Sequence, residues 1–446
     1  MGVMCEAEAG AKKTMIRVRE FDVGRDLRAV EELERRCQVG MSGDQNPDDN
    51  GGARKKKTKK GMSLYVEQIG DPFSRIRHAP DHVILVAEYG DEEDIVGVIK
   101  ACTRMVSRGK TKKKQSPSSS KQQCHQFVKV ACLLGLRVSP SHRCKHIAPS
   151  NASKHDSALT QIICRRLGIA SELVRRAESW SASRGASHAT MATTASNTAS
   201  LALFTGPRFA YAPFRRPVFL GHPVHRHRAR LPRAHRVLRL PPPLAAAAYA
   251  ALLPPAAAEF QPADLPALLA HKLTLGTYLA IERSGPARGP PSYALLSVWD
   301  ATRSLRLRVG GAPTLLRASL AAARALDRNA PWLQLPSVPD IFRPFGTYLL
   351  YGLRMSGPEG PALLRTLCRH AHNVARKNPA CAVVAADLGP DDPAAAAVPH
   401  WPRFSSDEDV WCIKKLRVNG GNARDDDDDW TASSPAGVLF VDPREF

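Results

Sequence analysis

Apolar positions recur alternately at strand spacing and at helix spacing along the first half of the chain. Residues 15–21 (MIRVREF) and 82–106 carry β-branched runs that predict a strand and a hairpin. Between them, Leu27, Val30 and Leu33 recur at the spacing of a helix. This alternation of strands and helices predicts an α/β fold.

A central strand and a helix follow. Residues 127–138 (FVKVACLLGLRV) are apolar on both faces, which predicts a strand in the middle of the sheet. Residues 183–194 predict a turn and a further strand, 196–204 a short helix with Ser196 as its N-cap, and 208–220 a closing strand. An amphipathic helix between them is predicted by one apolar stripe, made of Leu167, Ala170, Leu173, Val174, Ala177 and Trp180.

The second half of the chain repeats this layout. GLRMS at 352–356 matches GLRVS at 135–139, and an apolar strand precedes the motif in both places. Further strands are predicted at 381–389 and at 409–416, the latter closing the second unit. The helix of this half has an apolar side made of Leu363, Leu364, Leu367, Ala371 and Val374. We therefore expect two tandem units of one α/β design, each with a mixed sheet.

These patterns divide the chain into regions. In order, we expect a flexible N-terminus at 1–13, a first domain at 14–220, a linker at 221–243, a second domain at 244–418 and an acidic tail at 419–446. The first domain contains two basic loops and one segment without an apolar period, at 42–62, 107–126 and 144–164.

The chain of 446 residues has a formal net charge of +22, which favours acidic partners such as nucleic acid, acidic proteins or phosphorylated cofactors. The runs at 54–60 (RKKKTKK) and 108–114 (RGKTKKK) indicate either solvated loops or nuclear import signals. The sequence shows no secretory signal and no apolar run of membrane-spanning length, so we expect a protein of the nucleus or cytosol without a membrane partner. Ten scattered cysteines predict reduced thiols.

Two groups of polar residues are weak indications of a bound ligand. The first has zinc-binding residue types but lacks the close second pair of a zinc site, so no metal is expected: Cys144, His146, His155 and Cys164. The second is a basic stretch that indicates either a solvated segment or phosphate contacts with nucleic acid or an acidic protein; its histidines are His222, His225, His227 and His235.

Arg165 and Arg166 stand just before the helix that Gly168 introduces. A helix N-terminus attracts anions and repels cations, so two arginines there suit a turn whose ligand is more negative than they are positive. Exposed N–H groups at the start of a helix, with a glycine that lets the backbone approach closely, can hold a pyrophosphate. We therefore expect a phosphate-rich cofactor.

The same stretch resembles motif A of the GNAT acetyltransferases, (Arg/Gln)-x-x-Gly-x-(Gly/Ala), with Arg165, Gly168 and Ala170 at its fixed positions. Residues 197–211 resemble motif B of that family. Segments including LLGLRVSPSHR, RRLGIASELV, LFTGPRF, DVWCIKKL and FVDPREF resemble the plant Hookless-type N-acetyltransferases over nearly the whole chain. This resemblance implies a GNAT acyltransferase fold followed by a second, degenerate GNAT-like unit.

The resemblance also implies acetyl-CoA as the donor and direct attack by an amine of the acceptor, from which a base removes a proton. The acceptor stays open among histone tails, other nuclear proteins and small amines, and the family is tied to the nucleus and to hormone-responsive differential growth. Backbone amides at 136–138 would orient the thioester carbonyl, and 165–170 would hold the pyrophosphate. The implied cofactor-binding residues are Leu136, Arg137, Val138, Arg165, Arg166, Leu167, Gly168, Ile169, Ala170, Asn197 and Phe204.

The sequence departs from the family pattern in three ways. Phe204 stands where many members have a tyrosine that protonates the leaving thiolate, and no carboxylate is marked as the base, Glu172 being the nearest to motif A. Residues 144–164 interrupt the phosphate-binding turn, which indicates a retained intron or gene-model error, or else a real insertion that covers the site or leaves an inactive isoform. In the second unit Pro361 occupies the turn, so that unit is expected to complete an acceptor groove.

Two other functions remain open from the sequence. One is a non-catalytic nuclear regulatory protein that uses a GNAT scaffold to contact chromatin or a transcription factor. The other is a basic nucleic-acid-binding α/β protein, whose DNA affinity would fall steeply with salt.

Overall fold

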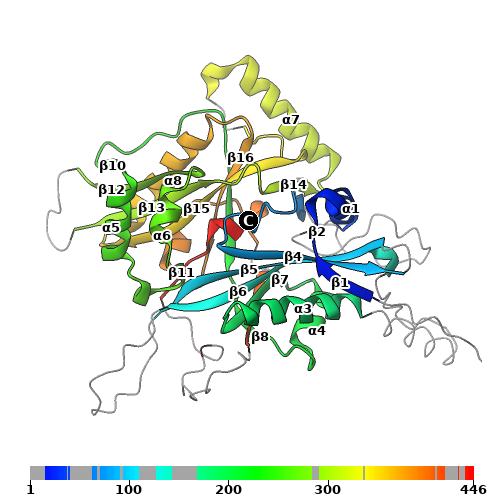
Figure 1. The fold of residues 1–446 in the computed structure, drawn as a ribbon. Coiled ribbons are helices and arrows are strands. Elements are labelled where there is room, and N and C mark those ends of the chain that lie inside the picture. Colours follow the sequence, from blue (N-terminus) through cyan, green and yellow to red (C-terminus); the bar gives the residue numbers. More distant parts are fainter. Residues whose placement is uncertain are drawn as a thin grey trace, which may run out of the picture.

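The computed structural model of the chain describes residues 16–37, 39–40, 63–67, 71–90, 94–109, 127–142, 168–283, 291–334, 337–406, 409–416, 430 and 437–445. These residues form two mixed sheets with helices packed against them (Figure 1). The predicted α/β class with two units is confirmed. Among the described helices, none is long and apolar enough to span a bilayer.

The first sheet contains the strands predicted from the first half of the chain, except that the closing strand predicted at 208–220 divides, with 212–215 in this sheet and 218–220 in the second. Its order is β1 (Ile16–Glu20), β4 (Asp81–Tyr89), β5 (Asp94–Arg108), β6 (Phe127–Val138), β7 (His188–Thr194), β17 (Asp409–Lys415) and β8 (Ala212–Arg215). At one end of β5, β11 (Ala258–Pro262) is added, and β18 (Val438–Leu439) pairs with β11. β6 pairs antiparallel with β5 and parallel with β7, as expected of a central strand.

The second sheet is also mixed, with a parallel pair among antiparallel pairs. Its order is β10 (His235–Leu240), β12 (Thr274–Glu282), β13 (Tyr293–Asp300), β15 (Phe345–Ser356), β14 (Arg306–Gly310), β3 (Ser63–Glu67) and β2 (Val39–Gly40). β16 (Cys381–Leu388) joins β15 in parallel, and β9 (Val218–Pro223) pairs with β16.

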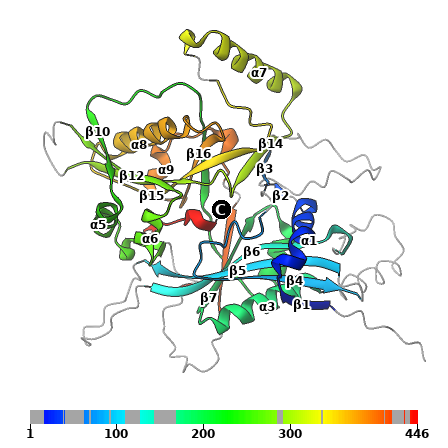
Figure 2. The same ribbon diagram turned by 45° about the horizontal axis from the view of Figure 1, so that its top comes forward.

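Helices cover both faces of the first sheet. α3 (Ile169–Ser183) and α4 (Thr198–Thr205) lie on one face, and α1 (Val23–Arg36) lies on the other (Figure 2). α3 approaches the sheet closely because Gly97 has no side chain: a Cβ there would lie 2.9 Å from both Ile169 and Leu173. The remaining helices are α5 (Pro242–Leu252), α6 (Leu265–Ala270), α7 (Thr314–Asn329), α8 (Gly360–Ala375) and α9 (Pro393–Ala397), with short 3-10 turns η1 (Pro140–His142), η2 (Pro255–Ala257), η3 (Pro331–Leu333), η4 (Pro402–Phe404) and η6 (Pro443–Glu445).

The two sheets exchange strands. Residues 409–416 were expected to close the second unit, but β17 pairs with β7 and β8 in the first sheet. Conversely, β9 continues from the first half into the second sheet, and β2 and β3 also lie there. That expectation was wrong because it followed chain order, whereas antiparallel strands can pair over any separation in sequence. The division of the chain into domains at 220 and 244 stays a prediction.

One further expectation needs correction. The segment 221–243 was predicted as a linker, yet it holds the end of β9 and all of β10. Of the tail at 419–446, Trp430 and residues 437–445 are described, and the tail packs against the first sheet with Trp430 only 1% exposed. Figure 1 shows its red terminal turn between the two sheets. The apolar end of the tail and Trp430 pack with Phe260, while the acidic run at 425–429 lies outside the described residues.

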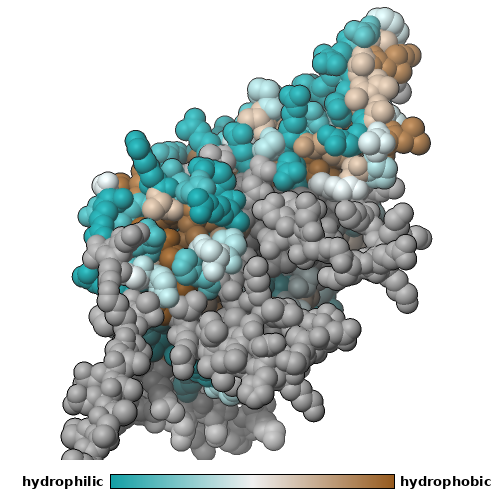
Figure 3. Space-filling model, turned by 90° about the vertical axis from the view of Figure 1, so that its right-hand side faces the viewer, coloured by the Kyte–Doolittle hydropathy of each residue, from teal (hydrophilic) through white to brown (hydrophobic). Residues whose placement is uncertain are grey.

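Helix α7 projects from the body of the molecule. Leu315 is 81% exposed and Trp332, in the following 3-10 turn, is 76% exposed. Figure 3 shows apolar and polar groups mixed on this projection at the top of the view.

Candidate active site

The parallel ladder between β6 and β7 ends before either strand does. Its paired residues run from Val130↔His188 to Leu133↔Met191, but β6 continues to Val138 and β7 to Thr194. The strands therefore part after Leu133. Among the described residues, the pairing of β6 continues beyond Leu133 with β5, whereas the ladder with β7 has ended.

A β-bulge in β6 lies at the start of the wedge. The pairing with β5 slips by one residue, so that Gly135 and Leu136 together face Ile99. Gly135 has φ +60°, a conformation that favours glycine. The bulge redirects the backbone of 136–138 relative to the rest of the strand. The predicted carbonyl-orienting residues thus lie on the edge that faces the wedge.

Helix α3 begins directly after Gly168, whose φ is +50°. Among the described residues, no side chain caps this N-terminus. The N–H groups of the first turn, at Ile169 and Ala170, therefore have no intrahelical acceptor and suit an anion. Three predicted cofactor residues of this turn, Arg165, Arg166 and Leu167, lie outside the described residues, as does the segment 144–164.

Glu172, the carboxylate nearest to motif A, lies on the outer face of α3. Its oxygens accept hydrogen bonds from Arg175 at 2.5 and 2.9 Å and from Arg176 at 3.2 Å. The hydrogen bond from Arg175 lowers the pKa of Glu172. This side chain is engaged on the helix surface, as expected of a solvated residue, and is unsuited to serve as a base.

The predicted motif B residues build α4 and its packing. Asn197, and not Ser196, is the N-cap, because Asn197 Oδ1 accepts a hydrogen bond from the N–H of Ser200 at 3.1 Å. The ring of Phe204 is 2% exposed and packs against Tyr211 at a centroid distance of 5.2 Å. Phe204 therefore faces the core between α4 and the sheet.

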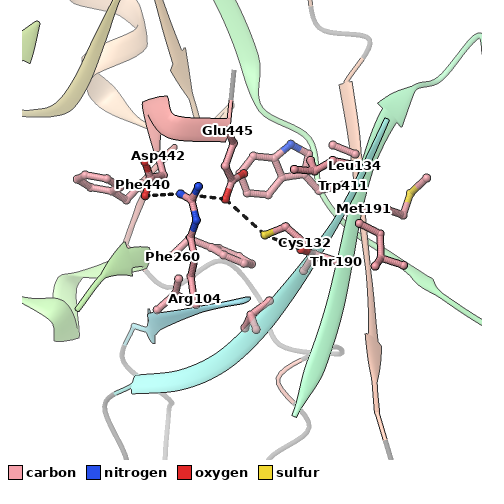
Figure 4. A pocket seen from close by; sticks show the side chains of 14 residues that line it. Arg104, Cys132, Leu134, Thr190, Met191, Phe260, Trp411, Phe440, Asp442 and Glu445 are labelled. Atoms are coloured by element: carbon pink, nitrogen blue, oxygen red, sulfur yellow. Dashed lines mark hydrogen bonds and ion pairs between the residues drawn. The ribbon is translucent and has the colours of Figure 1, made fainter. Parts of the chain in front are cut away.

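A pocket opens on the sheet face opposite α3, where β6 and β7 part (Figure 4). Cys132, Leu133 and Leu134 of β6 line this pocket at the point where the ladder with β7 ends. Its other lining residues come from β5, β6, β7, β11, β17 and the C-terminal segment: Arg104, Val106, Val130, Thr190, Met191, Ala192, Phe260, Trp411, Phe440, Asp442 and Glu445.

Two carboxylates and one arginine are the charged groups of this lining. Arg104 Nη1 lies 2.7 Å from Asp442 Oδ2 and 3.7 Å from Glu445 Oε1. Arg444 also binds Asp442, through Nη2 at 2.7 Å. Figure 4 shows Arg104 between the two carboxylates and Glu445 reaching toward Cys132.

The sequence analysis did not single out Arg104, Asp442 or Glu445 as site residues. The segment FVDPREF was noted only for its resemblance to the family. No periodicity shows that this terminal stretch returns to the first sheet, so spatial proximity to β6 was needed to find these groups.

Metal ligation has no support in the described residues, since no group of three or more His, Cys, Asp or Glu side chains there is arranged to hold an ion. Cys144, His146, His155 and Cys164 lie outside these ranges. The histidines of the basic stretch 222–240 pack against neighbours: His227 bonds Asp327 of α7, and His235 Nδ1 lies 2.7 Å from Thr366 Oγ1 of α8.

Sequence comparison identifies relatives over the whole chain. A model of the acetyltransferase (GNAT) family matches residues 163–206. The protein named acetyl transferase GW6a of Oryza sativa subsp. japonica is 63% identical over 97% of this chain and 98% of its own length. Two Arabidopsis thaliana proteins, named probable N-acetyltransferase HLS1-like and probable N-acetyltransferase HLS1, are 37% and 38% identical over 97% and 96% of this chain and 99% of their own lengths.

Solved structures match more distantly. A GCN5-related N-acetyltransferase from Kribbella flavida has a TM-score of 0.41 at 12% identity, over 92% of this chain and 73% of that chain. Saccharomyces cerevisiae N-myristoyltransferase with bound myristoyl-CoA has a TM-score of 0.42 at 11% identity, over 90% and 79%. These scores are low, so the family assignment rests on the sequence relatives.

The parted strands, the bulge and the matched family model define an acyltransferase of the GNAT class. The chain belongs to the family of plant N-acetyltransferases that includes GW6a and HLS1. The resemblance inferred from the sequence is thereby confirmed, and the chain is an N-acetyltransferase.

Proposed function

We propose that this chain transfers the acetyl group of acetyl-CoA to an amine of a protein or small-molecule acceptor by direct attack. The observation that carries the proposal is the wedge between β6 and β7, which meets α3 on one face of the sheet and the pocket on the other. A donor in the wedge would present its thioester to an acceptor in the pocket. Each substrate would then have its own side of the sheet.

The donor's contacts follow from the backbone. The backbone at 136–138 lies beyond the last rung between β6 and β7, and the family resemblance assigns its N–H groups to the thioester carbonyl, where such donors would stabilise the negative charge that develops on the oxygen. The open N–H groups of Ile169 and Ala170 suit the pyrophosphate. Arg165 and Arg166 precede this turn in the sequence, and their charge would add to its attraction for phosphates.

A second candidate function is a non-catalytic nuclear regulator built on the same scaffold. The observation that favours it is the buried, hydroxyl-free ring of Phe204 at the position of the family's thiolate-protonating tyrosine. In an active enzyme, water entering the wedge would have to protonate the departing thiolate instead.

Binding and turnover separate the two functions. We expect calorimetry to show acetyl-CoA binding by the full chain or by a variant without 144–164, and a thiol assay to show CoA release when amines are added. The amines would be a blocked lysine peptide, a peptide with a free N-terminus, and spermidine. Binding without turnover would favour the regulator, and a folded protein that does not bind acetyl-CoA would contradict both the enzyme and a CoA-dependent regulator. The variant also shows whether 144–164 closes the site.

We also propose a nuclear location and a role in hormone-responsive growth. The support is the family resemblance together with the lysine runs at 54–60 and 108–114. A fluorescent fusion with these lysines replaced by glutamine would leave the nucleus if the runs are import signals.

A further inference from the structure

The pocket holds two carboxylates whose surroundings differ sharply. Asp442 is 5% exposed and forms ion pairs with both Arg104 and Arg444. Burial alone would raise the pKa of Asp442, but these two guanidinium groups hold it at about 2. Asp442 therefore stays ionised and hydrogen-bonded, and has no tendency to accept a proton.

Glu445 is the less restrained of the two. Its nearest guanidinium is Arg104, at 3.7 Å, and that group is already matched at shorter range by Asp442. Burial raises the pKa of Glu445, and the charge of Asp442 adds to the rise while Arg104 opposes it. The side chain is 25% exposed and lines the pocket, so a ligand there can reach it.

The position of Glu445 relative to the wedge is fixed by two contacts. Cys132 Sγ donates to Glu445 Oε1 at 3.4 Å, and Cys132↔Thr190 is the rung just before the last paired rung of the β6–β7 ladder. One residue of a strand advances about 3.3 Å, so the carboxylate stands within one or two residues of the point where the strands part. Arg75 Nε holds the backbone carbonyl of Glu445 at 2.7 Å, which keeps the turn in place.

Apolar groups form the rest of the wall that an acceptor would meet. Trp411, Phe260 and Met191 line the same pocket. Phe260 has φ +62°, an unfavourable conformation for a residue with a side chain, and its ring packs against Trp411 at a centroid distance of 5.4 Å. The pocket therefore combines an apolar wall with a single weakly paired carboxylate.

We infer that Glu445 is the catalytic base of the acetyl transfer, and that the pocket admits a primary amine on an apolar stem from the face opposite α3. The amine nitrogen attacks the thioester carbonyl carbon, and a C–N bond forms as the C–S bond breaks. The proton lost by the nitrogen passes to the Glu445 carboxylate, and CoA leaves as a thiolate. The thiolate then takes a proton from solvent, and Glu445 returns its own to solvent. This inference rests on the proposed acetyltransferase function.

The test compares Glu445→Gln, Glu445→Asp and wild type in CoA release, using the three amines named above. We expect kcat to fall about 100-fold or more in Glu445→Gln, the range lost with a general base, while the Kd for acetyl-CoA is unchanged. Glu445→Asp keeps a carboxylate and should recover part of kcat. In wild type, kcat should decline as the pH falls through the raised pKa of Glu445, because the protonated carboxyl cannot accept a proton; this limb should be missing from Glu445→Gln.

The matched control is Glu32→Gln, which removes the same charge from an exposed site on α1 where Glu32 pairs with Arg35 and Arg36. It should leave kcat unchanged. A kcat of Glu445→Gln within twofold of wild type would overturn this inference and leave the proposed function standing. Residual activity of Glu445→Gln that still declines at low pH would have the same consequence. If Glu445→Gln does not fold, Glu445→Asp takes its place. A Glu445→Asp variant whose kcat, and whose decline of kcat at low pH, equal those of wild type would overturn the inference. Absence of CoA release by wild type with every amine, despite acetyl-CoA binding, would overturn the proposed function and this inference together.

Discussion

Two glycines with positive φ flank helix α3, Gly168 at +50° and Gly185 at +78°. A Cβ added at either position would meet nothing within 4 Å. Alanine at each would therefore cost only the strain of a left-handed backbone, about 1 kcal/mol. Only Gly168 lies where the backbone is expected to meet a phosphate.

The pair gives a matched prediction. Gly168→Ala and Gly185→Ala should lower the free energy of unfolding by similar amounts, and only Gly168→Ala should weaken acetyl-CoA binding, by roughly tenfold for one charge-assisted hydrogen bond disturbed. Chemical denaturation and calorimetry measure the two effects. Equal affinity in both variants would remove Gly168 from the cofactor site.

The local backbone geometry at Gly168 and Gly135 was predictable from the sequence, whereas the position of the proposed base was not. Gly168 and the bulge residue Gly135 stand in short motifs at the end of a strand and the start of a helix, and such local geometry is encoded locally. Glu445 acquires its role from burial beside Arg104, more than 300 positions away in the chain. Local patterns carry no information on such a contact.

Among the elements, the repeated motifs GLRVS and GLRMS mark the same feature twice: a glycine with positive φ within a strand that pairs in parallel with its neighbour. Gly352 of β15 has φ +63°, like Gly135 of β6, and β15 pairs in parallel with β16 as β6 does with β7. In the second unit, however, the buried Tyr249 packs against the bulge, since a Cβ at Gly352 would lie 2.5 Å from the Tyr249 hydroxyl. Pro361 also removes one N–H from the first turn of α8. The second unit has therefore kept the architecture, with Tyr249 packed at the bulge and one N–H fewer at the start of its helix.

Neutral histidines pack between α8 and the segment from β9 to β10. The free energy of unfolding of the chain is therefore expected to fall in acid. His372 of α8 is 3% exposed, its ring lies 4.1 Å from that of His225, and neither ring nitrogen has a hydrogen-bond partner within the described ranges. Burial, with the nearby charges of His225, His222 and Arg376, lowers its pKa to about 4. Burial also lowers the pKa of His222 and His225.

The sign of the pH effect follows from these shifts. The unfolded chain binds protons at His372 near pH 6.5, before the folded chain does, so the stabilising effect is complete above that pH and is lost as the pH falls toward 4. We expect the loss to reach about 3 kcal/mol for His372. Denaturation of His372→Leu should show a smaller decline over this range than wild type, and the control His82→Leu, at an exposed position, should decline like wild type. Parallel curves for all three proteins would contradict this assignment.

At the scale of the whole molecule, strand exchange makes each sheet depend on both halves of the chain. β17 lies between β7 and β8, and β11 extends β5, so the first sheet needs residues beyond 250. A buried pair joins the halves as well: Arg215 Nη2 lies 2.6 Å from Glu259 Oε1, with both side chains under 10% exposed. Helix and strand types followed from periodicity, but this exchange did not.

A fragment of residues 14–220 should therefore not fold stably on its own. It lacks β17, β11 and the C-terminal turn, so β7 would have an open edge and the apolar face around Val130 would be exposed. We expect the fragment to melt without a cooperative transition by circular dichroism, while the full chain melts cooperatively. A sharp transition in the fragment would show that the first sheet is autonomous.

The arrangement of β17 and the terminal turn also sets the order of events during translation. β7 is synthesised roughly two hundred residues before its partner β17, so the nascent first half emerges with an incomplete sheet until β17 has left the ribosome. The pocket in which we place the acceptor gains the wall formed by Phe440, Asp442 and Glu445 only after β17 has been synthesised. A frameshift just after the codons of β17 would thus leave most strands of both sheets encoded and still remove Asp442 and Glu445 from the pocket.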